Sequence, residues 1–540
     1  MNTEKKTEIE NVTVEKIESA IALTGLEFSL QQKELMMKRV SENYSKYKDI
    51  RKVTISNKIV PALYFSPQLP QMTFNLQKKP IETSKSTGVD LPEEIESLAF
   101  STVTILASLL STRKISSLDL TKMYLKRIKA YNPILKCVIT VTEDLALKQA
   151  ERADKEIQSG YYRGPLHGIP YGVKDLFAYP GYPTTWGAAP YKDQMLNEKA
   201  TVIKKLEGAG AVMIGKLSMG ALAWGDVWFK DQTKTPWDGH EGSSGSSAGP
   251  ASATAAGLVA FSIGTETWGS IVSPSNKCGT TGLRPTFGRV SRYGAMNLSW
   301  SMDKIGPICR ATEDCAVVFD AIYGPDGQDS SIVEFPFNWD GNLPIDGFRI
   351  GFDQKAFDNT EYYLENPDAQ MNDAAVLYEM QKLGIKLKPI DLPELPIEAL
   401  SIILSAEAAA AFDSLTRTKR DSLLVRQEED AWPNVFRVAR LIPAVEYIQA
   451  NRIRTLLIQE MHNLFKEIDV YIAPSFSRSL LLTNLTGHPA VVVPNGFTRK
   501  GMPTSITFIG NLYDEAGVLS VAKAFQDATT HNARIPPDFL

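Results

Sequence analysis

The stretch that decides the fold is Gly242–Ser275, GSSGSSAGPASATAAGLVAFSIGTETWGSIVSPS. A Gly/Ser run over residues 242–249 is followed by an Ala-rich segment, 251–258, that we expect to be helical. A short apolar strand is predicted over 259–263, and a second small-residue turn over 264–270. Backbone N–H groups left free at such turns form pockets for negative charge, so the pattern favours an anion-stabilising site.

Ser246 and Ser270 occupy the two turns. Each serine is either a hydrogen-bonding turn residue or a nucleophile. Taken alone, the Gly/Ser run is also typical of a flexible loop. A phosphate-binding loop is excluded, because that motif requires a Lys directly after its last Gly, and none follows Gly245 or Gly249.

Lys174 lies in a second informative stretch, residues 164–177, GPLHGIPYGVKDLF. A lysine of ordinary pKa, about 10.4, acts as a base only if burial and neighbours lower that value. The apolar residues on both sides of Lys174 favour burial. From the local sequence alone, however, a buried ion pair between Lys174 and Asp175 is the simpler interpretation.

Amide hydrolysis needs a nucleophile, a base, an acid for the leaving amine, and donors for the oxyanion. A Ser–His–Asp triad is one solution, and its members can be far apart in sequence. The histidines are poorly placed for it, since they are scattered and only two, His240 and His488, lie near motif-like segments. The other three are His167, His462 and His531.

The GIPYGVKD stretch, the GSSAG run and the GTETWGSI turn, in this order and spacing, resemble the amidase signature family. The resemblance runs from about residue 98 to the C-terminus. It implies the amidase signature fold and a Ser–Ser–Lys arrangement in which a cis peptide flanks one serine. By motif position, Lys174 would be the base, Ser246 the proton relay, and Ser270 the nucleophile that forms an acyl-enzyme. The oxyanion would be bound by the backbone N–H groups of Thr267, Trp268, Gly269 and Ser270.

Four positions depart from the family pattern. Ala248 and Pro250 stand where Gly and Ser are common, and Glu266 stands where Asp is usual. Trp268 occupies a position that is commonly Gly. Its side chain either lines the substrate pocket or points into the core, in which case only its N–H contributes.

Val272 indicates which kind of substrate the enzyme accepts. Family members that act on acidic or amidated acidic substrates, such as the A subunit of glutamyl-tRNA amidotransferase, commonly carry an arginine here that pairs with a carboxylate. Trp268, Ile271 and Val272 offer apolar surface instead, although Arg284 or Arg289 could supply the missing charge. The sequence around Val272 is more similar to that of peptide amidases.

We therefore expect an amidase that cleaves a neutral, apolar or peptide-like amide. An ester or carbamate hydrolase of the same family and the A subunit of a glutamyl-tRNA amidotransferase are the alternatives. Retention of Lys174, Ser246 and Ser270 together argues against a third alternative, a non-catalytic binding protein on the same fold.

Composition limits the partners. The 540 residues are 43% hydrophobic and 22% charged, with a net charge of −4, so no bulk charge favours nucleic acid or an anionic membrane. The charged, polar start and the lack of a long apolar stretch predict a soluble, cytoplasmic enzyme. We expect a small-molecule or peptide amide substrate and leave a homodimer open. Four cysteines without CxxC spacing and five histidines predict neither a metal site nor a cofactor.

Helical and strand patterns alternate through much of the chain, which predicts an α/β fold whose mixed, mostly parallel sheet is covered by helices on both faces. Strands are expected at 138–141, 169–174, 211–214, 259–263, 347–352, 386–390, 470–473 and 490–493. Helices are expected at 103–111, 117–131, 145–158, 201–208 and 251–258, and residues 397–465 are largely helical.

Residues 1–97 are predicted to be an N-terminal helical extension and linker, and residues 98–540 the catalytic domain. Within the extension, residues 13–51 favour two helices, the second beginning at Ser29 with a capping-box Gln32. We expect this pair to pack against the main body. An oligomer contact or a lid over a site is the alternative.

Overall fold

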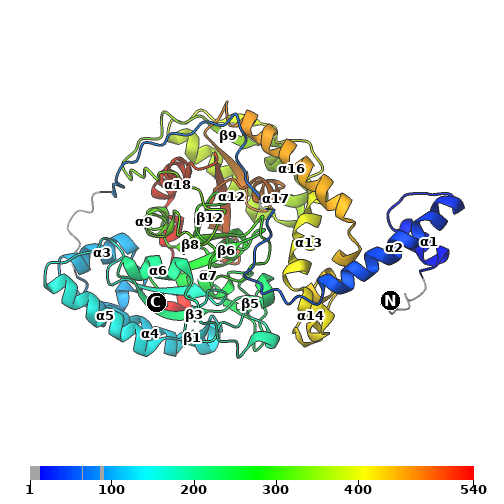
Figure 1. Cartoon of the computed structure of the whole chain (residues 1–540). Coiled ribbons are helices and arrows are strands. Elements are labelled where there is room, and N and C mark those ends of the chain that lie inside the picture. Colours follow the sequence, from blue (N-terminus) through cyan, green and yellow to red (C-terminus); the bar gives the residue numbers. More distant parts are fainter. Residues whose placement is uncertain (1–11, 64, 85–90) are drawn as a thin grey trace.

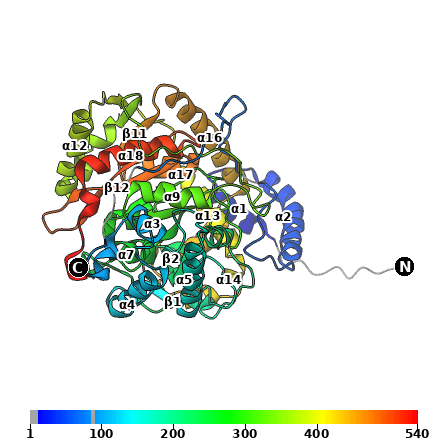
Figure 2. The same cartoon turned by 90° about the vertical axis from the view of Figure 1, so that its left-hand side faces the viewer.

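The computed structural model describes residues 12–63, 65–84 and 91–540; the remainder of the predicted extension and linker lies outside this range. Within the described residues, an eleven-stranded sheet is flanked by helices (Figures 1 and 2). Its strand order is β1 (Val138–Val141), β3 (Val212–Leu217), β2 (Pro170–Lys174), β6 (Phe261–Glu266), β8 (Lys304–Cys309), β7 (Thr281–Arg284), β12 (Ala490–Phe497), β13 (Pro503–Gly510), β11 (Val470–Pro474), β9 (Ile350–Asp353) and β10 (Lys388–Ile390). A separate hairpin contains β4 (Lys234–Thr235) and β5 (Asp238–Gly242).

The sheet is mixed, as predicted, but the expectation that it is mostly parallel is wrong. In the described part of the chain, parallel pairing joins β3, β2 and β6 at one side and β11, β9 and β10 at the other. The strands between β6 and β11 pair antiparallel, as does β1 with β3. Strands β7, β8 and β13 were not predicted, because glycines, prolines and polar residues interrupt their apolar pattern.

The helices predicted over 103–111 and 201–208 are present with the predicted bounds, and the other three predicted between residues 117 and 258 are present with shifted ends. Helix α7 (Ala248–Ala255) begins three residues before the predicted start, directly after Ser247. Strand β6 starts later than expected. Other helices are α3 (Val103–Ser111), α4 (Ser117–Leu135), α5 (Glu143–Gln158), α6 (Thr201–Gly208), α8 (Val272–Cys278), α9 (Thr312–Ile322), α10 (Gln354–Phe357), α11 (Thr360–Glu365), α12 (Pro367–Lys382), α13 (Ile402–Ala411), α14 (Asp413–Arg417), α15 (Trp432–Val438), α16 (Ala444–Leu464), α17 (Ser479–Thr486) and α18 (Glu515–Thr529). Among the described helices, none is long and apolar enough to cross a membrane.

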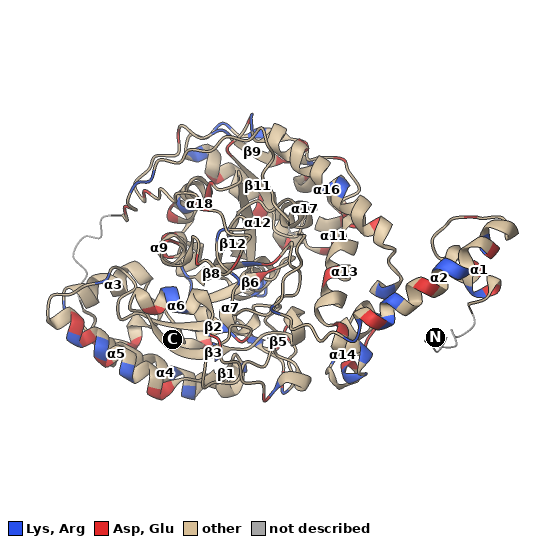
Figure 3. Ribbon diagram, in the orientation of Figure 1, with Lys and Arg blue, Asp and Glu red and all other residues tan. Residues whose placement is uncertain are grey.

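The N-terminal pair consists of α1 (Val14–Ala22) and α2 (Leu30–Ile50), and the predicted Ser29–Gln32 capping box is present. The pair projects away from the main body, and α2 buries only Ser41 along its length (Figure 1). The expected packing against the main body is therefore wrong. Residues of both charge signs occur along α2, which suits a solvated helix (Figure 3).

After α2, the chain continues as an extended arm over the main body. The Asn57 side chain donates to Asn297 O at 2.8 Å, and the rings of Phe65 and Phe287 meet edge to face. Further along, Glu82 forms a β-bridge with Asp340. The arm is thus attached to the body at several points, while the division of the chain at residue 97 stays a prediction.

The close approach of two strands in the central sheet requires a glycine at position 306. A Cβ at Gly306 of β8 would lie 1.9 Å from the carbonyl oxygen of Leu283 in β7. We expect Gly306→Ala to lower the free energy of unfolding by about 2 kcal/mol or more, because the strands must separate. Thermal unfolding followed by circular dichroism measures this. Gly347→Ala, where a Cβ meets open space, is the matched control, and equal stability of the two variants would contradict the argument.

Candidate active site

Lys174 is the last residue of β2, and its side chain is fully buried. Its Nζ donates to Ser246 Oγ at 2.8 Å, to Ser247 Oγ at 3.1 Å and to Thr265 Oγ1 at 2.8 Å. Burial lowers the pKa of Lys174 to about 7, although the nearby charges of Asp303 and Glu266 raise it. Near neutral pH a large fraction of this amine is therefore uncharged and able to accept a proton.

Asp175 does not pair with Lys174, so the simpler interpretation of the sequence is wrong. Its carboxylate lies 2.8 Å from Lys216 Nζ of β3, and both side chains are completely buried. Asp175 also accepts the backbone N–H of Thr185 at 3.0 Å. Successive side chains of an extended segment point to opposite sides, so Asp175 turns away from the pocket that holds Lys174.

The serine loop brings Ser246 to the lysine. The Gly245–Ser246 peptide bond is cis, as the family resemblance implied. A Cβ at Gly245 would lie 1.9 Å from the carbonyl oxygen of Gly225, so this close approach of two loops requires glycine. Ser246 is 1% exposed and thus shielded from bulk water by the loop around it.

Ser247 and Thr265 are partners that the sequence analysis missed. Besides contacting Lys174, Ser247 Oγ donates to Thr265 O at 3.0 Å. The backbone N–H of Ser247 donates to Ser270 O at 3.2 Å, which joins the serine loop to the turn that carries Ser270. Both residues lie inside the motifs already recognised. Their hydroxyl groups, close in sequence to Ser246 and Ser270, are the feature of the sequence that could have identified them.

Glu266 anchors the turn that carries Ser270. Its carboxylate accepts the backbone N–H groups of Ile271 at 2.8 Å and Val272 at 3.0 Å. It also pairs with Arg284 at 2.8 Å and accepts from Asn484 Nδ2 at 2.8 Å. Burial opposes ionisation, but Arg284 and the hydrogen bonds outweigh it and lower the pKa of Glu266 to about 2.

The turn itself is held at its start and in its middle. Thr267 Oγ1 donates to the buried Asp303 carboxylate at 2.6 Å, and Gly269 has a φ of 82°, a conformation that favours glycine. Glu266 already takes the N–H groups of Ile271 and Val272. The four predicted oxyanion donors, Thr267 to Ser270, directly precede those two and stay candidates for that role.

The side chains of this turn differ in how far they are exposed to solvent. Ser270 is 8% exposed, whereas Trp268 is 45% exposed. The interpretation that places Trp268 in the core is therefore excluded, and its indole lies at the surface beside the predicted nucleophile. Val272 is buried, and its aliphatic side chain offers no charged partner for a carboxylate at this position.

Neither arginine that could replace the missing charge is free. Arg284 is completely buried and donates to Thr483 Oγ1 and His488 O in addition to its pair with Glu266. Arg289 is also completely buried, and its Nε lies 3.2 Å from a carboxylate oxygen of Glu515. Removing either guanidinium from its partner would leave a buried charge unpaired, which costs several kcal/mol.

No histidine among the described residues is hydrogen-bonded to Ser246 or Ser270. His488 is buried, shares a hydrogen bond with Thr486 Oγ1 at 2.7 Å, and has a pKa lowered by burial to about 3. His167 is buried next to Glu156, at 3.0 Å. These positions favour Lys174 over a histidine as the base.

An α/β fold in which a lysine of lowered pKa contacts a serine suits an enzyme of acyl transfer. Comparison with known proteins agrees. The family model described as Amidase matches residues 119–481. The A subunit of the glutamyl-tRNA(Gln) amidotransferase from Marinomonas sp. (strain MWYL1) is 33% identical over 483 residues, which cover 80% of this chain and 98% of that protein.

Solved structures give the same family. The native peptide amidase from Stenotrophomonas maltophilia is 27% identical with a TM-score of 0.71, covering 82% of this chain and 99% of that one. An amidase family protein from Bacillus anthracis str. Ames is 25% identical with a TM-score of 0.73, covering 82% and 93%. The chain belongs to the amidase signature family and is a hydrolase that acts on amide C–N bonds.

The pH dependence of kcat/KM tests the role of Lys174. The amine must be uncharged to accept a proton, so kcat/KM should rise with pH up to about 7 and then level off. Lys174→Ala should lower kcat by at least about 10²-fold. Steady-state rates from pH 5 to 10 measure both effects. Near-normal activity of Lys174→Ala, or a profile that falls above neutrality, would contradict this role.

Ser270 is tested by covalent labelling. Ser270→Ala should abolish both hydrolysis and labelling by a fluorophosphonate, because the attacking oxygen is removed while the fold is kept. Intact-mass analysis with peptide mapping locates the label. Ser273→Ala, three residues further on, is the matched control and should still be labelled. A label that persists in Ser270→Ala, or maps to another serine, would show that the nucleophile is elsewhere.

Proposed function

We propose that the protein hydrolyses a neutral, apolar or peptide-like amide through a Ser270 acyl-enzyme, with Lys174 and Ser246 as the proton path. The main support for the proposed catalytic mechanism is the 2.8 Å hydrogen bond between the buried Lys174 Nζ and Ser246 Oγ. It supplies the base that a serine nucleophile needs.

The proposed first step forms the acyl-enzyme. Uncharged Lys174 takes the Ser246 proton while Ser246 takes the Ser270 proton, and Ser270 Oγ attacks the amide carbon. The carbonyl oxygen gains negative charge and accepts hydrogen bonds from the N–H groups of residues 267–270. The proton then returns through Ser246 to the nitrogen, the C–N bond breaks, and the amine leaves.

The second step regenerates the enzyme. Water attacks the acyl carbon and loses its proton through the same Ser246–Lys174 path. The bond from Ser270 Oγ to the acyl carbon breaks, and the serine oxygen recovers a proton. The carboxylic acid then leaves, so that one amide and one water give one acid and one amine.

The preference for a neutral substrate rests on Val272, which carries no charge, and on the pairing of Arg284 and Arg289 with buried carboxylates. An acidic substrate buried at that point would need a partner for its charge. Val272 has none, and Arg284 and Arg289 are committed to Glu266 and Glu515. Ile271 and Val272 are buried, and the exposed indole of Trp268 provides apolar surface that suits an uncharged acyl group.

A second candidate is the A subunit of a glutamyl-tRNA amidotransferase, favoured by the 33% identity to such a protein. Co-purification with partner proteins and glutamine-dependent ammonia release would support it. An ester or carbamate hydrolase is a close variant of the first candidate, since the same acyl chemistry serves all three bonds.

A panel of amides separates these candidates. We expect higher kcat/KM for uncharged apolar primary amides and anilides than for glutamine or asparagine, because a charged substrate finds no partner at the turn. Ammonia or aniline release at equal substrate concentration gives the comparison. If glutamine or asparagine is the best substrate of the panel, the amidotransferase candidate moves ahead.

A further inference from the structure

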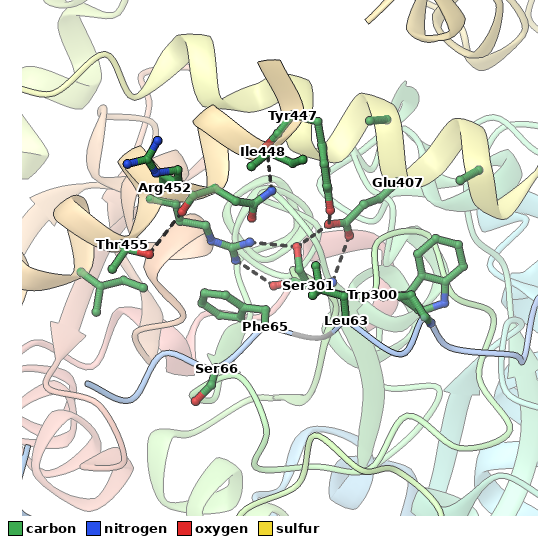
Figure 4. Close-up of a pocket in the computed structure, with 16 residues that line it drawn as sticks. Leu63, Phe65, Ser66, Trp300, Ser301, Glu407, Tyr447, Ile448, Arg452 and Thr455 are labelled. Carbon is green, nitrogen blue, oxygen red and sulfur yellow. Dashed lines mark hydrogen bonds between the residues drawn. The ribbon is translucent and has the colours of Figure 1, made fainter. Parts of the chain in front are cut away.

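A cavity of about 660 Å³ lies between α13, α16 and the N-terminal arm (Figure 4). Small-molecule sites typically enclose roughly 300–1,000 Å³, so this volume fits a drug-sized ligand. Of the described residues that line it, none is Lys174, Ser246 or Ser270. The candidate catalytic residues therefore form no part of its described wall.

The buried charges in its wall are satisfied by protein partners. Glu407 accepts from Ser299 Oγ at 2.6 Å, from Ser301 at 3.0 Å (N–H) and 2.7 Å (Oγ), and from Tyr447 Oη at 2.8 Å. Arg454 donates to Ser301 Oγ and Ser301 O, each at 2.8 Å. Neither charge needs a ligand, so the inner wall does not select for a charged one.

The same network fixes the shape of the wall. The hydrogen bonds in Figure 4 tie α13 to α16 and to the Trp300–Ser301 segment. Arg454 also lies under the ring of Phe65, 3.5 Å from its centroid, which joins the arm to the network. A cavity with a wall held in this way is formed before the ligand arrives, and this lowers the cost of binding.

The mouth of the cavity is apolar. Leu63 of the arm and Ile448 of α16 both line it, and they are 84% and 56% exposed. Among the described lining residues, the charged group at the outer part is Arg452, which is exposed and donates to Gln449 Oε1 at 3.0 Å. A ligand that covers the two aliphatic side chains removes apolar surface from water, which favours binding.

The outer wall comes from a segment that precedes the family match. Pro61, Leu63, Phe65 and Ser66 line the cavity, whereas the family model matches residues 119–481. We propose that the cavity binds an uncharged, largely apolar small molecule, with the N-terminal arm as its outer wall. This binding does not depend on the proposed substrate.

Fluorescence titration of the full-length protein with N-phenyl-1-naphthylamine, an uncharged apolar probe, tests the proposal. We expect saturable binding of one probe per chain. Ala406→Leu places extra carbon atoms in the cavity and should weaken binding by about tenfold or more. Ala444→Leu is the matched control, because Ala444 is an exposed residue of α16 that does not line the cavity, and it should bind as the parent protein does.

Further measurements keep the test decisive. Ile448→Glu puts a charge at the exposed mouth and should also weaken binding, while thermal unfolding checks that each variant is folded. Binding should survive after Ser270 has been blocked by a small sulfonyl fluoride. The proposal is overturned if Ala406→Leu binds the probe normally, if blocking Ser270 removes binding, or if the anionic 8-anilinonaphthalene-1-sulfonate binds at this site equally well.

Discussion

The site depends on a lysine that is buried without a carboxylate partner in contact. Lys174 is surrounded by the hydroxyl groups of Ser246, Ser247 and Thr265, and its neighbour Asp175 is neutralised by Lys216. A charged amine in such a setting is costly, so burial favours the uncharged form that can act as a base. If Asp175 faced Lys174 instead, the ion pair would hold the amine in its charged form. The separation of these two side chains is therefore what gives the lysine its chemistry.

The turn that carries Ser270, the proposed nucleophile, is positioned by a second buried group, Glu266. Its carboxylate ties the turn to Arg284 of β7 and Asn484 of α17, elements that are far apart along the chain. The substitution of Glu for the usual Asp keeps the acidic group in this network. Strands β6, β8, β7 and β12 pair antiparallel in this order, so the turn that follows β6 is attached to the centre of the sheet. Together with the bond from Thr267 to the Asp303 carboxylate, Glu266 links the turn to the fold.

The sequence predicts the local parts of this account well. Lys174 and Ser246 lie in short motifs whose spacing carries the family pattern, and the structure brings the two side chains into contact. The partners of Asp175 and Glu266 could not be predicted from the sequence, because Lys216 and Asn484 come from other elements and no local pattern links them. Strands β7, β8 and β13 were missed for the same kind of reason: tertiary pairing, not apolar alternation, makes them strands. The arm that walls the cavity likewise carries no motif.

Direct titration of Lys174 tests the central claim. Protein labelled with ¹³C at lysine Cε is followed by NMR from pH 5 to 11, and the Lys174→Arg spectrum identifies the signal that belongs to this residue. We expect a midpoint of about 7 for the Lys174 amine. A midpoint near 10.4, the ordinary value for a lysine, would contradict it, because the amine would then be charged at neutral pH and unable to take a proton from Ser246.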